Sequence, residues 1–170
     1  VTDLYIQDHL RVDGLAEALN FSSSATDLNG KGEVTFAAFI EPSQADFGSD
    51  NGIFDMDKDS GGDDNTTLRF DKSGYDGGGT NVLKFSLQTT EGQLNLETES
   101  NVHFEGKGHV AVTWVSGETP KVYLEGQQLG TTSVKVYDTN GTELEGVQTI
   151  GGVIDGIETL SLADGPKGGM

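Results

Sequence analysis

The chain has 170 residues, and its 28 acidic and 10 basic side chains give a formal charge of −18 at pH 7. Such a surface repels nucleic-acid phosphates and anionic lipid, so we expect neither as a partner, and cations are the natural counterparts. The chain has no cysteine, which excludes disulfides, thiolate nucleophiles and cysteine-based metal centres. No apolar run approaches the roughly 18 residues that cross a bilayer, so we expect no membrane insertion.

The first expected element is a short helical turn within residues 8–19, where Gly14 interrupts the helical periodicity. Elsewhere the apolar residues alternate with a period of two, in segments 33–41, 81–89, 109–115 and 121–125, and Gly- or Asn-Gly-containing turns separate these segments. This pattern predicts half-buried antiparallel strands. We therefore expect one all-β domain, a two-sheet antiparallel β-sandwich of roughly ten to thirteen strands. The alternating residues are Val34, Phe36, Ala38 and Ile40, then Leu83, Phe85 and Leu87, then Val110, Val112 and Trp114, then Val122 and Leu124.

An acidic segment, residues 46–76, carries nine Asp against three basic residues, a net charge of −6. Carboxylates at alternate positions converge on one centre if the loop wraps, and hard oxygen ligands suit calcium. The pattern resembles the first half of an EF-hand loop, but Ser60 replaces the glycine and Thr66 stands where the bidentate Glu would be. A solvated acidic loop on a salt-adapted surface is the alternative. The expected Ca²⁺ ligands are Asp55, Asp57, Asp59, Asp63 and Asp64, with backbone carbonyls completing the shell.

A second loop, residues 71–81, combines an aromatic ring, an acid and an amide with the glycine run 77–79. A ring that stacks on a sugar and polar groups that bond its hydroxyls make a typical ligand surface. The candidate ligand-binding residues are Tyr75, Asp76 and Asn81; the alternative is an ordinary long turn.

Residues 108–117, Gly-His-Val-Ala-Val-Thr-Trp-Val-Ser-Gly, and the following strand of residues 121–129 resemble the signature hairpin of the concanavalin A-like lectin/glucanase superfamily, in its laminin-G-like and pentraxin-like branch. Residues 18–21 and 33–42 resemble the opening strands of that family, with Phe39 where a Trp is frequent, and residues 52–56 match its next core strand. The resemblance covers residues 18–129, leaving 1–17 as a lead-in and 130–170 as C-terminal strands. It implies a jelly roll of two packed sheets.

The C-terminus departs from the family pattern. Residues 152–160 match the usual closing strand only in part, because the aromatic end is absent. In a second alignment, residues 159–162 form the penultimate strand and the sandwich lacks its last one. Another segment or chain would then supply that strand, or its edge would be protected in another way.

Catalytic patterns are absent from the sequence. Glucanases on the implied fold place carboxylates at alternate positions of one strand, and the nearest pair here, Asp155 and Glu158, has a spacing of three that puts the two side chains on opposite strand faces. There is no G-x-S-x-G, and His9, His103 and His109 lack zinc-binding spacing. Trp114 alternates in phase with Val110 and Val112, so we expect it in the core.

The resemblance implies a non-catalytic, calcium-associated module of a secreted or cell-surface protein, similar to domains of large bacterial surface adhesins and carbohydrate-active enzymes. Its expected role is adhesion to a glycan or another surface ligand. A scaffold or split domain that positions a neighbouring domain is the alternative, and a glycan-cleaving enzyme is a weaker one. Because the sequence starts Val-Thr-Asp, without an initiator methionine or signal peptide, we expect neighbouring domains of the same polypeptide as partners.

Overall fold

The fold is all-β. The computed structural model describes residues 19–21, 25–40, 51–57, 66–71, 81–99, 102 and 108–162. Within these ranges there are eleven strands, one 3₁₀ helix and no α-helix, so no helix of the described part is long and apolar enough to cross a membrane. Of the expected helical turn, only Leu19 is described, and it opens β1. The elements are β1 (Leu19–Phe21), η1 (Ala25–Leu28), β2 (Glu33–Ile40), β3 (Asn51–Asp57), β4 (Thr66–Asp71), β5 (Val82–Thr89), β6 (Gly92–Thr98), β7 (Gly108–Val115), β8 (Lys121–Leu124), β9 (Gln127–Gln128), β10 (Thr131–Tyr137) and β11 (Thr159–Leu162).

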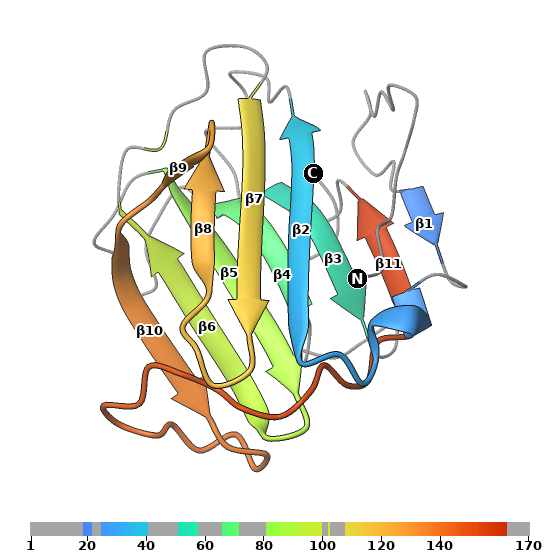
Figure 1. Ribbon diagram of the computed structural model, residues 1–170, viewed down its shortest axis with the longest axis vertical. Coiled ribbons are helices and arrows are strands. Elements are labelled where there is room, and N and C mark those ends of the chain that lie inside the picture. Colours follow the sequence, from blue (N-terminus) through green and yellow to red (C-terminus); the bar gives the residue numbers. More distant parts are fainter. Residues whose placement is uncertain are drawn as a thin grey trace.

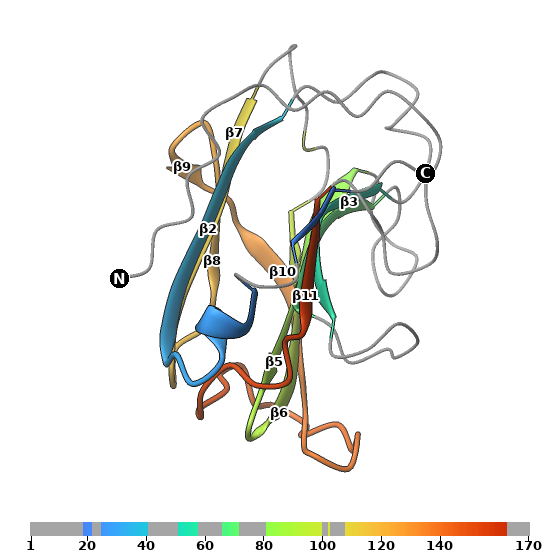
Figure 2. The same ribbon diagram turned by 90° about the vertical axis from the view of Figure 1, so that its right-hand side faces the viewer.

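The strands form two antiparallel sheets. The larger sheet has the order β1-β11-β3-β4-β5-β6-β10, and the smaller one has the order β2-β7-β8-β9. Figure 1 looks through the smaller sheet onto the larger one, and Figure 2 shows the two layers edge-on. The prediction of a two-sheet antiparallel β-sandwich is confirmed, whereas jelly-roll connectivity stays a prediction.

The period-two segments are strands β2, β5, β7 and β8, within one residue of the expected bounds. The expected core strand at residues 52–56 lies within β3, where Phe54 and Met56 are buried. Alternation works because successive residues of a strand point to opposite faces, so one phase reaches the core.

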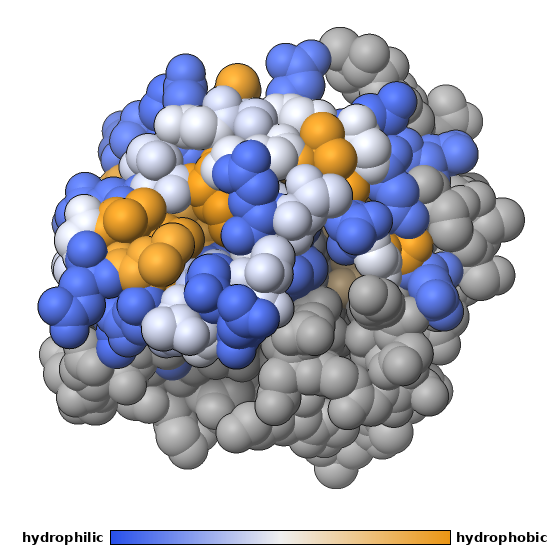
Figure 3. All heavy atoms as spheres, turned by 90° about the horizontal axis from the view of Figure 1, so that it is seen from below, coloured by the Kyte–Doolittle hydropathy of each residue, from blue (hydrophilic) through white to orange (hydrophobic). Residues whose placement is uncertain are grey.

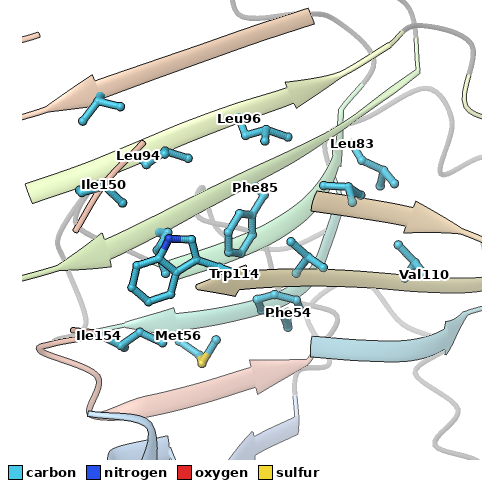
Figure 4. Packing of buried hydrophobic residues seen from close by; sticks show 14 of the residues in the cluster. Phe54, Met56, Leu83, Phe85, Leu94, Leu96, Val110, Trp114, Ile150 and Ile154 are labelled. Atoms are coloured by element: carbon cyan, nitrogen blue, oxygen red, sulfur yellow. The ribbon is translucent and has the colours of Figure 1, made fainter. Parts of the chain in front are cut away.

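The core lies between the two sheets. Trp114 of β7 is 2% exposed, which confirms its expected place in the core, and it lies among buried residues of the larger sheet (Figure 4). The rings of Phe36 on β2 and Phe54 on β3 approach across the layers, with centroids 4.5 Å apart. Fully burying a side chain of this size contributes about 1.5–3 kcal/mol, so these contacts hold the sheets face to face.

A segment without strands closes the lower end of the sandwich. Residues 138–158, here called the strap, leave β10, cross beneath both sheets and enter β11 (Figure 1). Ile154 bonds the segment ahead of β2, since the Gly30 N–H donates to the Ile154 carbonyl (2.8 Å) and the Ile154 N–H donates to the Lys31 carbonyl (2.9 Å). In the β5–β6 turn, the Thr90 N–H donates to the Val153 carbonyl at 2.9 Å. The strap therefore joins the lower ends of strands from both sheets.

The strap also supplies core side chains. Ile150, Ile154 and Ile157 are all buried in the same apolar cluster as Trp114. The Asn29 side chain fixes the end of the strap, because its amide donates to the Ile157 carbonyl (2.8 Å) and its oxygen accepts the Ile157 N–H (2.9 Å). Residues 152–158 thus form a plug rather than a regular closing strand, and residues 159–162 form β11. That β11 is the penultimate strand of an incomplete sandwich stays a prediction.

The β5–β6 turn requires glycine at one position. Gly92 has a φ of +134°, and a Cβ there would fall onto the carbonyl oxygen of Tyr137 at the end of β10. The absence of a side chain lets the strap leave β10 directly beneath this turn.

The plug generates a stability prediction. Ile154→Ala removes a fully buried side chain, so we expect the free energy of unfolding to fall by about 2–5 kcal/mol through lost burial and the cavity left behind. The matched control is Val147→Ala in the same strap. Val147 is 39% exposed at the lower end, where apolar side chains form small groups between hydrophilic ones (Figure 3), and its truncation should change stability by less than about 0.5 kcal/mol. Chemical denaturation measures both; equal effects would contradict the plug.

Candidate functional site

The predicted calcium ligands lie at and beyond the end of β3. Asp55 and Asp57 occupy alternate positions of this strand, between and after the buried Phe54 and Met56. Their side chains lie outside the described part of the structure, as do Asp59, Asp63 and Asp64 in the β3–β4 connection. Among the described residues no three His, Cys, Asp or Glu side chains converge as metal ligands. Calcium binding by the acidic segment therefore stays a prediction.

Of the predicted ligand-binding residues, only Asn81 is described; Tyr75 and Asp76 lie outside the described ranges. Asn81 is half-buried directly before β5 and has a φ of +56°, a left-handed conformation that Asn tolerates better than most residues. Its carbonyl accepts the Val102 N–H at 2.9 Å. Asn81 therefore has a structural role in starting β5.

The smaller sheet presents a face to the outside of the sandwich, here called the outer face. Its members alternate with core residues along β2, β7 and β8, and the strand register sets them in rows. Phe39 is opposite His109 in one row; Ala37, Ala111, Tyr123 and Gln128 form the next. The outer face consists of Glu33, Thr35, Ala37, Phe39, His109, Ala111, Thr113, Val115, Lys121, Tyr123 and Gln128.

Phe39 is the most exposed large apolar residue of the described part, with 81% of its surface accessible. Its ring contacts the His109 ring, with centroids 4.9 Å apart and planes inclined by 56°. The backbone of His109 is fixed by the β8–β9 turn, since its N–H donates to the Glu125 carboxylate (2.6 Å) and its carbonyl accepts the Glu125 N–H (2.8 Å). The pair thus stands on a fixed backbone, with Phe39 open to solvent and His109 half-buried.

The side chains in the row next to Phe39 are small or uncharged. Ala37 and Ala111, in the neighbouring row, have small side chains that leave the ring uncovered on that side. Tyr123 and Gln128 continue this row with a hydroxyl and an amide. Apart from His109, the strand positions of the outer face include one acidic and one basic side chain, Glu33 and Lys121, and the Glu125 carboxylate adjoins His109 at the border of the face. An uncharged ligand that offers both apolar and hydroxyl groups matches this composition.

The outward side of the larger sheet differs, because its polar groups are shielded. Lys84 and Glu97, paired in register on β5 and β6, are only 5% and 8% exposed. On the same side, the side-chain oxygens of Gln88 and Asn95 are shielded from solvent and have no hydrogen-bond partner. Atoms closed off in this way do not offer an open binding surface.

Asp155 and Glu158 are the residues of the sequence that come nearest to a catalytic carboxylate pair. Both lie in the strap rather than on a strand, and both side chains are exposed.

Comparison of this chain with known protein families, curated proteins and solved structures finds no match. The candidate site therefore rests on the residues themselves.

The strap contains one carboxylate, that of Asp138, whose pKa is lowered by its hydrogen bonds. Backbone N–H groups of Thr142 and Asn140 donate to the Asp138 carboxylate at 2.9 and 2.8 Å and hold its pKa below the ordinary 3.8. These bonds favour the ionised form and fix the turn that follows β10. The lowered pKa of Asp138 thus comes from bonds that shape a turn, and Asp138 is not part of the outer face.

This turn generates a pH prediction. Because the pKa of Asp138 is lower in the folded chain, its contribution to stability is present above pH 3.8 and is lost as the pH falls through the folded pKa. Asp138→Asn should therefore make the unfolding free energy less steeply dependent on pH below about 4. An NMR titration of the Asp138 carboxyl carbon measures the shift directly, and a midpoint at or above 3.8 would contradict it.

Proposed function

We propose that this chain is a non-catalytic adhesion module of a secreted or cell-surface protein that binds a glycan through its outer face. The observation that carries the proposal is the open Phe39 ring, held beside His109 on the smaller sheet. Apart from its contact with His109, the Phe39 ring is hydrated in the isolated domain, and burial against a ligand would remove this apolar surface from water.

A saccharide suits the outer face for two reasons. The C–H side of a sugar ring packs flat on an aromatic ring, and its hydroxyls find partners in side chains such as Tyr123, Thr113 and Gln128. The face also lacks the large apolar area of a stable protein interface, which buries about 800 Å² per partner; only Phe39 and Val115 are large exposed apolar residues there.

The family resemblance supports the same role. Its most specific part, the hairpin of residues 108–129, coincides with β7, β8 and β9, which carry most of the outer face. The resemblance implies a module of the kind found in bacterial surface adhesins. The proposed location is accordingly extracellular.

Calcium binding is the second part of the proposal. The nine Asp of residues 46–76 repel one another, and a bound divalent cation would relieve this repulsion. The proposed site begins at the end of β3, in the larger sheet, and so belongs to a different layer from the outer face.

Phe39→Ala tests the ligand face. Because the ring is exposed, we expect the melting temperature to stay close to that of the wild type, while affinity for the glycan that gives the strongest array signal falls at least tenfold, or about 1.4 kcal/mol. The matched control is Val115→Ala at the opposite end of the same face, where Val115 pairs with Glu33 and is 44% exposed.

Isothermal titration calorimetry of both variants separates the outcomes. Equal affinities of the wild type and Phe39→Ala would place the ligand elsewhere. A glycan array without any signal would favour the scaffold function instead, and hydrolysis of a β-glucan would overturn both.

The calcium proposal predicts calorimetric heat on titration with Ca²⁺ and a higher melting temperature in millimolar Ca²⁺, reversed by chelator. Asp57→Asn combined with Asp59→Asn removes two carboxylates and should weaken or abolish both effects. Asp155→Asn is the matched control, since this Asp lies in the strap outside the acidic segment. The absence of heat and of thermal stabilisation in the wild type would contradict calcium binding.

A further inference from the structure

Strand β2 is at the end of the smaller sheet. Among the described strands it pairs only with β7, through eight consecutive residue pairs without a register shift. Its other edge runs for eight residues along the flank of the sandwich (Figures 1 and 2).

One hydrogen bond beside β2 shows which of its residues direct their backbone N–H and C=O groups to β7. The Ser116 N–H donates to the Gly32 carbonyl at 2.7 Å, which makes residues 32 and 116 a hydrogen-bonded pair. Such pairs alternate with non-bonded pairs along an antiparallel ladder. Even-numbered residues of β2 therefore direct their backbone groups to β7. The N–H and C=O groups of Glu33, Thr35, Ala37 and Phe39 point to the opposite edge, which pairs with no described strand and is here called the free edge.

The core beneath this edge is incompletely covered. The inward-facing residues Val34, Phe36, Ala38 and Ile40 are all half-buried. Their register partners on β7 that face the core, Val110, Val112 and Trp114, are at most 2% exposed. One further strand beside β2 would bury the inward-facing side chains of β2, as β2 buries those of β7.

Proteins normally block such an edge with proline, lysine, a bulge or a very short strand. Strand β2 reads Glu-Val-Thr-Phe-Ala-Ala-Phe-Ile, with no proline or lysine, and its register is regular over eight residues. The edge therefore has the properties of a strand acceptor.

We infer that the free edge of β2 accepts an added strand from a partner polypeptide in which apolar residues alternate with polar ones and a basic residue lies near Glu33. The apolar phase covers Val34, Phe36 and Ala38, and the polar phase continues the outer face. Charge decides between this occupant and a second copy of the chain. Two copies at −18 each repel one another, whereas a basic segment is attracted.

The experiment uses the full chain and a synthetic eight-residue peptide in which valine alternates with threonine, with one added lysine. Fluorescence anisotropy of the labelled peptide at 0.15 M salt measures affinity. A twin with glutamate in place of lysine tests the charge. Two further versions of the peptide test the alternation of the hydrogen bonds. One is N-methylated at its odd-numbered amides and the other at its even-numbered amides. Only one of these two sets of N–H groups can donate to the free edge, so the two versions should differ in affinity.

Ala37→Pro is the decisive variant. It removes a donor from the free edge and leaves the bonds between β2 and β7 in place, so the domain should fold, and peptide affinity should fall at least tenfold. Thr35→Pro also removes a donor from the free edge and serves as a second variant if Ala37→Pro fails to fold. Val147→Ala, in the strap and away from the outer face, is the control and should bind the peptide as the wild type does.

Support requires that the lysine peptide binds best, that the two N-methylated versions differ, and that the proline variant loses affinity. The inference is overturned if the proline variant binds as tightly as the wild type, or if the wild type binds none of the peptides. Sedimentation that finds a wild-type dimer dissociated by Ala37→Pro would assign the edge to a second copy, and equal affinity of the glutamate twin would overturn the basic partner.

Discussion

The structure depends on the closure of the lower end of the sandwich by the strap. Two sheets with apolar inner faces exclude water only if the gap between their ends is also filled, and Ile150, Ile154 and Ile157 fill it. The same segment bonds the approach to β2 and the β5–β6 turn, which belong to different sheets. Burial and backbone hydrogen bonding thus act at the same residues. The strap and the core contacts between the layers together set the relative position of the sheets.

The outer face keeps its arrangement because the smaller sheet is held in a fixed position. Strand β7 buries Val110, Val112 and Trp114 on one side and carries His109 and Thr113 on the other, so the packing of the core holds the candidate site in place. Strand β2 combines two features with separate consequences. Its outward side chains include Phe39, and its edge away from β7 pairs with no strand of the described part. The proposed glycan site and the inferred strand acceptor would therefore use neighbouring parts of one strand.

The strands could be predicted because alternation is a local signal, and the β2, β5, β7 and β8 segments show it clearly. The strap could not be predicted, because its buried isoleucines are spaced by bonds to distant turns and not by a regular period. The order of the larger sheet was equally out of reach, since β11 pairs with β1 and β3 across long stretches of chain. Phe39 carried a usable signal, because it lies in the outward phase of β2, opposite to Val34 and Phe36. The family resemblance accounts for it only as a position where a Trp is frequent.

The central claim is that the outer face, and not the loops beside β3 and β5, meets the ligand. Amide chemical-shift mapping by NMR tests this most directly, with the ¹⁵N-labelled chain titrated with the best array glycan in the presence of Ca²⁺. The account predicts that the largest shifts lie on β2, β7 and β8 around Phe39, His109 and Tyr123. Shifts confined to residues 58–81, with an unchanged outer face, would contradict it.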